Sequence, residues 1–316
     1  RKSKYSKIKI KTLQDISELY IQTRLIEGLN PQTIERFKYA YKNLVKSNMI
    51  GEKSSIKILC DADFDDFKKY WQGKHSPNTI WINLSKIRAF MNWCKRKGFI
   101  KKVPTIEVKY IPKPISYFTD QEFNSLMKSS LKDKWKRAFL FYRETGCRKR
   151  EPFKSTLVGN TLIIDPLKQK DKPRRITLSD VLVAIYNEMM SDYVYRRKEL
   201  KHKAKSIWDS YYDKLIEGCK EVEIRHTLHD LRDTYAVRQW AITGDIHLVS
   251  QMMGHSSITQ TAEYAQFKPD ELYNHFPTLR AYIEPRLIDP NSLMDHTKTD
   301  HTIRNILPSI DKKSLN

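Results

Sequence analysis

Hydrophobic residues recur every three or four positions over the first third of the chain, the spacing of amphipathic helices. Helix-start signals accompany these runs, such as the capping pair of Thr12 and Asp15 and the proline that follows Asn30. The predicted helices begin at Thr12, Asn30, Ala62 and Ser76. Together they predict a compact module of four helices.

Prolines interrupt this pattern at Pro104, Pro112 and Pro114. Because proline fixes φ and blocks helix formation, the stretch predicts an extended linker. The predicted segments are therefore a basic arm (1–11), the helical module (12–103), the linker (104–117), a second domain (118–284) and a C-terminal tail (285–316).

The second domain is predicted to be mainly helical with a small β-sheet. Thr119 and Glu122 have the spacing of a capping box, which predicts a helix start at Thr119. Two short apolar runs flank a turn within 157–164, and Ile176 with Leu178 predicts a further strand. Helical spacing then returns.

Composition and charge point to an anionic partner. The chain has 316 residues, of which 40% are hydrophobic and 30% charged, values that suit a two-domain globular protein. Lys plus Arg number 58 and Asp plus Glu 37, so the formal charge is +21. Lys and Arg neutralise phosphates, so nucleic acid is the favoured partner.

Other classes are disfavoured by what the sequence lacks. No apolar stretch approaches the ~18 residues of a membrane helix, and the basic arm carries no signal-peptide core. The cysteines have no C-x-x-C spacing, which predicts free thiols in a reducing compartment and no zinc site; they are Cys60, Cys94, Cys147 and Cys219. We therefore predict a cytoplasmic protein that has no zinc site and binds no membrane.

Four short clusters in the second domain carry side chains suited to phosphate chemistry. They lie at 145–151, 168–172, 229–232 and 253–255, and Tyr264 follows the last. Each is weak evidence alone, because a lone basic residue is usually a solvated cation and a lone tyrosine usually packs in a core. Their order along the chain and the short final spacing are more specific.

This ordered set resembles the tyrosine recombinase, or phage integrase, family. The family pattern Thr-Gly-x-Arg-x-x-Glu falls on 145–151, His-x-Leu-Arg on 229–232, and the Gly-His-Ser-Ser-Ile segment with its later Thr and Tyr on 254–264. The resemblance implies a mainly α fold with an N-terminal four-helix core-binding (SAM-like) domain. It also implies a C-terminal mixed α/β catalytic domain with a small β-sheet.

The chemistry of these residue types fits attack on a DNA phosphodiester. Guanidinium groups match phosphate geometry, so Arg148 and Arg232 are predicted to neutralise the non-bridging oxygens. Tyr264 is the predicted nucleophile. His229 is the predicted general base or an orienter of the phosphate, and His255 is predicted to donate to a non-bridging oxygen.

Two further roles follow from the resemblance. A hairpin lysine supplies the proton of the leaving 5′-oxygen in the family, and its nearest match is Lys170, with Lys168 and Lys172 as alternatives. Glu151 is expected to support the arginine helix and the histidine network without touching phosphate. On the first module, exposed basic positions are predicted to contact DNA: Arg36, Lys42, Lys46, Lys86 and Arg88.

The sequence departs from the family pattern at three places. Asp233 follows the second arginine where members often carry histidine, which indicates different local proton handling. Pro152 follows Glu151, so the helix of Arg148 is expected to start or bend differently. A Lys- and Tyr-rich helical stretch over 188–223 is an enlarged connector of unassigned role.

The resemblance implies a site-specific DNA recombinase that cleaves and rejoins strands through a 3′-phosphotyrosyl link and needs no metal or other cofactor. Integration or excision of a phage or mobile element is the leading role, and a Xer-like dimer resolvase, a type IB topoisomerase and a non-catalytic DNA-binding protein are the alternatives. The implied partners are double-stranded recombination sites, three further copies of the chain in a tetramer on DNA, and accessory DNA-bending proteins.

Overall fold

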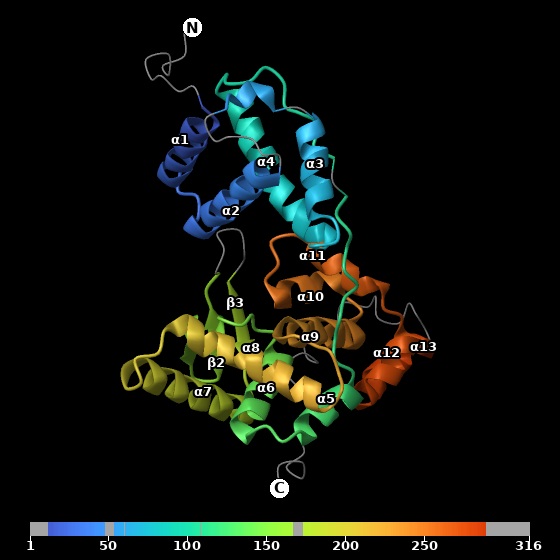
Figure 1. Cartoon of the computed structure of the whole chain (residues 1–316). Coiled ribbons are helices and arrows are strands. Elements are labelled where there is room, and N and C mark those ends of the chain that lie inside the picture. Colours follow the sequence, from blue (N-terminus) through green and yellow to red (C-terminus); the bar gives the residue numbers. More distant parts are fainter. Residues whose placement is uncertain (1–11, 48–53, 60, 108, 167–172, 289–316) are drawn as a thin grey trace. The chain divides into compact units, whose positions relative to one another are not determined.

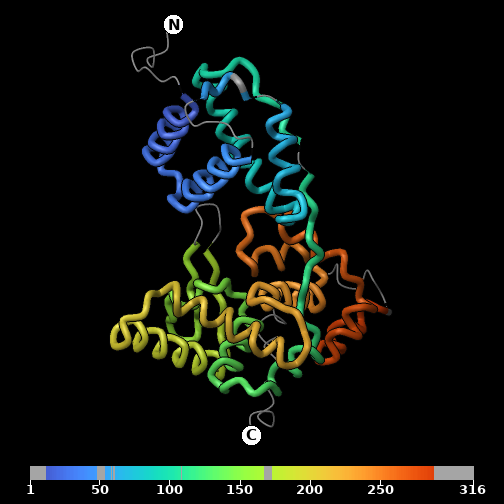
Figure 2. The backbone as a smooth tube through the Cα atoms, viewed as in Figure 1, coloured from blue at the N-terminus to red at the C-terminus, as the bar shows by residue number. Residues whose placement is uncertain are grey.

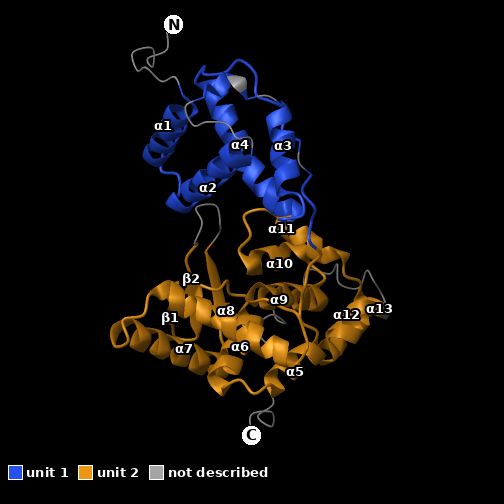
Figure 3. Cartoon of the chain, in the orientation of Figure 1, with its two compact units in different colours: residues 1–113 blue, residues 114–316 orange. Residues whose placement is uncertain are grey.

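The computed structural model describes residues 12–47, 54–59, 61–107, 109–166 and 173–288. The chain divides into two compact units, 1–113 and 114–316, which Figure 3 colours separately. Within the described ranges, no helix is long and apolar enough to cross a membrane. Each unit has its own hydrophobic core.

Unit 1 contains the predicted helices. Its elements are α1 (Leu13–Ile26), α2 (Pro31–Ser47), the 3₁₀ turn η2 (Ile56–Ile58), α3 (Asp61–Trp71) and α4 (Pro77–Arg96). Thr12 forms the expected capping box with Asp15, and Ser76 caps α4. The ring of Tyr20 lies 4.7 Å from that of Phe37 and 5.3 Å from that of Trp93, so aromatic contacts join α1, α2 and α4.

Unit 2 is a mainly helical domain with one small three-stranded sheet (Figure 1). Its first helices are α5 (Asp120–Lys128), α6 (Asp133–Thr145), the 3₁₀ turn η3 (Pro152–Lys154), α7 (Asp180–Lys198) and α8 (Ala204–Glu221). The later ones are α9 (Leu228–Thr243), α10 (Ile246–Met253), α11 (Thr259–Ala262), the 3₁₀ turn η4 (Glu263–Gln266), α12 (Pro269–His275), η5 (Pro277–Leu279) and α13 (Arg280–Ile288). The helix α13 thus extends past position 285, where the tail was predicted to begin.

The sheet is antiparallel, in the order β1 (Thr156–Val158), β2 (Thr161–Ile164), β3 (Arg174–Thr177). A turn at Gly159, which has a φ of 56°, joins β1 to β2, and the strands lie in the green-to-yellow part of the tube in Figure 2. The third strand ends before Leu178, which is buried instead in the core of the unit. The predicted small β-sheet is confirmed, with its last strand shifted toward the N-terminus.

Helix α9 is central to unit 2 because it contributes to two hydrophobic clusters. Leu228 and Leu231 belong to the larger cluster, whereas Val237 and Ala241 belong to the second, which also contains α10, α12 and α13. Between them, the buried carboxylate of Asp120 accepts hydrogen bonds from side chains of α6, α9 and η5, which are Arg143, Arg238 and Thr278. This network fixes α9 against its neighbours.

The stretch 188–223 is not merely a connector. It forms the second half of α7 and the whole of α8, and α8 buries Ile207, Tyr211 and Leu215 in the larger cluster. The prediction that the stretch is helical is confirmed. Its apolar face stabilises the same core that supports α6 and α9.

Candidate active site

The first sequence cluster lies at the end of α6. Thr145 is the last helical residue, and Gly146 ends the helix with a φ of 59°. A Cβ atom on Gly146 would stand 2.5 Å from a ring carbon of Tyr235 on α9, so glycine is required for both the backbone angle and the close approach. The expectation that Arg148 lies on a helix is wrong: Arg148 is in the turn between Gly146 and η3, which starts at Pro152.

Glu151 gathers three arginines at this turn. Its carboxylate accepts from the Arg148 guanidinium at 2.8 Å and from Arg174 at 2.6 Å, and it lies 3.9 Å from Arg232. Burial opposes the charge of Glu151, but Arg174, the Arg148 backbone N–H and Arg232 outweigh it and hold the pKa of Glu151 below its ordinary value. Glu151 therefore remains ionised and orders the guanidinium groups around it.

Arg174 is a site residue that the sequence interpretation missed. It begins β3, is 4% exposed, and donates to Glu151 and to the carbonyl oxygen of Met252 at 3.0 Å. A signal was present, since side chains alternate along a strand and Arg174 therefore shares a face with Ile176, while Arg175 points outward. Arg174 links the sheet, the Glu151 turn and the end of α10.

Arg232 is buried on α9 with its guanidinium held by backbone carbonyls. It is 1% exposed and donates to the oxygens of Gly146 at 2.5 Å and of Met253 at 2.6 Å. Burial and the nearby charges of Arg174 and Arg148 lower the pKa of Arg232 to about 10. A cluster of cations that repel one another in this way gains stability from a bound anion.

His255 stands beside Arg232, directly after Gly254, which ends α10. Its Nε2 lies 3.2 Å from a guanidinium nitrogen of Arg232, and its Nδ1 lies 2.8 Å from the hydroxyl of Thr261. Burial, with the charges of Arg232, Arg148 and Arg174, lowers the pKa of His255 to about 4. The imidazole is therefore neutral at pH 7, with Nε2 accepting from Arg232 and Nδ1 donating to Thr261.

Tyr264 lies on η4 and is 5% exposed. Its hydroxyl donates to Oδ1 of Asp233, at 2.7 Å, and Asp233 directly follows Arg232 on α9. Burial, followed by the charge of Asp233, raises the pKa of Tyr264 far above its ordinary value. His229 lies one turn earlier on α9, with Nε2 4.0 Å from the same Oδ1 of Asp233 and a side chain that is 67% exposed.

Most of the predicted catalytic residues therefore form two groups that are connected to each other, and the other predicted site residues lie elsewhere. Arg148, Glu151, Arg232 and His255 are linked by direct contacts, and Asp233 connects Tyr264 and His229 to them through α9. The predicted lysines lie outside the described residues, between β2 and β3; they are Lys168, Lys170 and Lys172. The predicted DNA-contacting residues lie on α2 and α4 of unit 1, where Lys86 is half-buried and the rest are exposed: Arg36, Lys42, Lys46 and Arg88.

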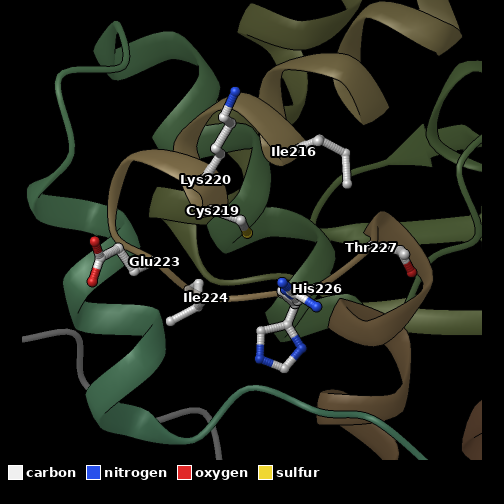
Figure 4. A pocket seen from close by; sticks show the side chains of 8 residues that line it. Ile216, Cys219, Lys220, Glu223, Ile224, His226 and Thr227 are labelled. Atoms are coloured by element: carbon white, nitrogen blue, oxygen red, sulfur yellow. The ribbon is translucent and has the colours of Figure 1, made fainter.

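A separate cavity lies away from this cluster. It measures about 540 Å³ and lies at the end of α8 and the segment leading to α9, where Figure 4 shows its lining side chains. His226 on its wall is buried between Glu122 and Asp230, each 3.4 Å away. Burial lowers the pKa of His226, but these two carboxylates outweigh it and raise the value above the ordinary one. None of the residues that line the cavity belongs to the arginine–tyrosine cluster.

Several solved structures share this fold. A lambda integrase dimer bound to a COC′ core site superposes with a TM-score of 0.66 at 13% identity, covering 81% of this chain and 77% of that chain. The Tn1549 transposon integrase with a circular intermediate DNA gives a TM-score of 0.61 at 15% identity, covering 86% of this chain and 99% of that chain.

A third similar structure is the XerH site-specific recombinase bound to its difH substrate, with a TM-score of 0.55 at 16% identity, covering 83% of this chain and 84% of that chain. The sequence matches no family model and no curated protein. The mainly helical structure with a small antiparallel sheet nevertheless matches the fold of the tyrosine recombinase catalytic domain. The chain therefore has the tyrosine recombinase fold.

Proposed function

We propose that this chain is a DNA strand transferase that cleaves one strand by attack of Tyr264 on a phosphodiester. One observation carries the proposal: Arg148, Arg174 and Arg232 gather around Glu151, and the Tyr264 hydroxyl is held by the residue that follows Arg232. Such a cluster supplies the two things that attack on a phosphodiester needs, which are positive charge for the phosphate and a nucleophile beside it.

The contacts and exposure of each residue indicate its proposed role. The Arg148 side chain is 23% exposed and can reach a phosphate. The Arg232 side chain is only 2% exposed, and the carbonyls of Gly146 and Met253 align it. His255 lies against Arg232, where its Nε2 can donate to a non-bridging oxygen once the ring proton moves from Nδ1 to Nε2. Glu151 and Arg174 are positioning residues, because both are buried and act by holding the other guanidinium groups.

The reaction is a transesterification. The Tyr264 oxygen loses its proton and forms a bond to phosphorus, and the bond to the 5′-oxygen breaks. The released 5′-oxygen takes a proton from a general acid, for which Lys170 is the proposed residue, and becomes a hydroxyl. Because the phosphotyrosyl link retains the energy of the broken bond, rejoining needs only the reverse attack. The arginine side chains provide the positive charge, and His255 provides a hydrogen bond.

The finer proposal is a site-specific recombinase that integrates or excises a phage or mobile element as a tetramer on two DNA sites. The similar structures include an integrase tetramer bound to a Holliday junction, which supports this assembly for the present chain. They include a XerH recombinase as well, so a role in resolving DNA dimers is the alternative.

A covalent trapping experiment tests the proposed function. Nicked duplexes tiled across the DNA that flanks the gene are incubated with the protein, and SDS-resistant protein–DNA adducts are counted. We expect adducts with the wild type and with Tyr273→Phe, a control whose hydroxyl contacts Glu284 away from the site, and none with Tyr264→Phe. Equal trapping by both variants would mean that another residue is the nucleophile.

Further arms separate the alternatives. Adducts at one sequence with strand exchange favour a recombinase, and relaxation of any supercoiled plasmid by dilute protein favours a topoisomerase. DNA affinity without adducts on any duplex favours a binding protein. In each case the affinity should fall with salt, by about 0.9 in log K per phosphate contact for each tenfold rise in salt.

A further inference from the structure

Asp233 occupies a place that the mechanism above leaves without a role. It follows Arg232 on α9, and its side chain is only 15% exposed. A phenol has a single proton to donate, and Tyr264 donates it to Oδ1 of Asp233 at 2.7 Å. The reacting oxygen of the proposed nucleophile is therefore in direct contact with a carboxylate before any DNA binds.

We propose that Asp233 is the catalytic residue that accepts the proton of Tyr264 when the phenol attacks DNA, and returns it when the strands rejoin. This inference rests on the proposed function. It replaces His229, which was predicted as the general base or as an orienter of the phosphate, in the first of these roles. The reason is contact: the Tyr264 hydroxyl donates a hydrogen bond to the Asp233 carboxylate at 2.7 Å, whereas Nε2 of the exposed His229 imidazole lies 4.0 Å from that carboxylate.

The surroundings of Asp233 suit a proton acceptor. Burial raises the pKa of its carboxyl, and Asp230 adds to this, while His229, the Tyr264 hydroxyl and Arg232 act in the opposite direction. A carboxylate with a raised pKa is a stronger base than a solvated one. The charge of Arg232 lowers the pKa of Tyr264, but burial and Asp233, with a smaller contribution from Glu263, outweigh it and keep the proton on the phenol at rest.

The proton then moves only as the new bond forms. The Tyr264 oxygen becomes bonded to phosphorus, its proton passes to Oδ1 of Asp233, and the phosphorus bond to the 5′-oxygen breaks. The 5′-oxygen receives its proton from the general acid, so one proton enters the site at the lysine side while another is held at Asp233. In the reverse reaction Asp233 reprotonates the departing phenolate. His229 becomes a positioning residue whose proximity favours the ionised form of Asp233.

The test compares Asp233→Asn with the wild type on two kinds of nicked duplex. One is ordinary DNA, and the other has sulfur in place of the 5′-bridging oxygen, so that the leaving thiolate needs no proton. We expect Asp233→Asn to form the phosphotyrosyl adduct about 10²–10⁴-fold more slowly on both, because it lacks the proton acceptor. Lys170→Ala serves as the comparison, since loss of a general acid is relieved by sulfur. Glu263→Gln, an exposed neighbouring carboxylate, is the matched control.

The results separate this inference from the proposed function. If the wild type forms no adduct on any duplex, both fail. If the wild type reacts and Asp233→Asn reacts within threefold of it, or faster, or recovers on the sulfur-substituted DNA, only the role of Asp233 is overturned. DNA affinity measured in parallel must not fall in Asp233→Asn.

A second variant covers the case in which Asp233→Asn misfolds. Asp233→His retains a proton acceptor whose ordinary pKa is about 6.5. We expect its cleavage rate to recover toward alkaline pH, with the acid-side loss of rate shifted upward from that of the wild type. An identical pH profile for the two proteins would show that this side chain does not take the proton.

Discussion

Glu151→Gln removes the charge that holds three arginines together, and its cost can be judged from burial. The side chain of Glu151 is 2% exposed and that of its partner Arg174 is 3% exposed. Removing one partner of a buried ion pair costs about 3–5 kcal/mol, because the other charge stays buried without compensation. Since glutamine can still accept one hydrogen bond, we expect a loss near the lower end, about 3 kcal/mol in the free energy of unfolding of unit 2.

The chain offers a matched control in Glu188→Gln. Glu188 makes the same type of contact with Arg137, at 2.7 Å, but both side chains are 39% exposed. Pairs of this kind contribute about 0–1 kcal/mol, because water and salt screen them. Both variants remove a carboxylate charge from a contact with arginine, so the difference between their losses of unfolding free energy measures the effect of burial.

Hydrogen exchange of the α6 and α9 backbone amides in the full chain measures the opening of unit 2. We expect protection to fall about a hundredfold in Glu151→Gln, since about 1.4 kcal/mol corresponds to a factor of ten. The pH dependence supplies a check. The pKa of Glu151 is lowered by folding, so its contribution is present above the unfolded value of about 4.3 and is lost as the pH falls through the folded value. If Glu151→Gln loses no more protection than Glu188→Gln, the reasoning is wrong.

Three further predictions follow from the same site. A non-glycine residue in the left-handed region costs about 1–2 kcal/mol, and Gly159→Ala, with open space around it, should destabilise unit 2 by that amount. Gly146→Ala should cost more, because its Cβ also meets the ring of Tyr235. Thermal unfolding of the two variants measures the difference. Folding lowers the pKa of His255 to about 4, so its contribution to stability is present above about pH 6.5 and declines as the pH falls toward 4. Over that pH range, the midpoint of urea unfolding should fall more steeply for the wild type than for His255→Asn. Arg174→Lys cannot donate as a fork to both Glu151 and the Met252 carbonyl, so adduct formation should slow at least tenfold while salt-dependent DNA affinity changes little; an unchanged rate of adduct formation would exclude the positioning role.

The sequence by itself determined the local structure well. Capping residues such as Thr12, Ser76 and Thr119 lie where the predicted helices begin, because a cap satisfies backbone N–H groups within its own turn. Spacing of apolar residues gave the helical modules, and the turn at Gly159 gave the sheet. The motif residues Arg148, Arg232, His255 and Tyr264 were also found in the sequence, since their order is specific even though each is common.

The tertiary structure alone decided which of these side chains touch. Arg174 is one of two adjacent arginines in a basic run, and only packing buries one and exposes the other. Asp233 was evident in the sequence as a departure, but its contact with Tyr264 joins residues 31 positions apart. Local rules of spacing and capping act within one or two helical turns, whereas hydrogen bonds and pKa values depend on groups that only the folded chain brings within a few ångströms of one another.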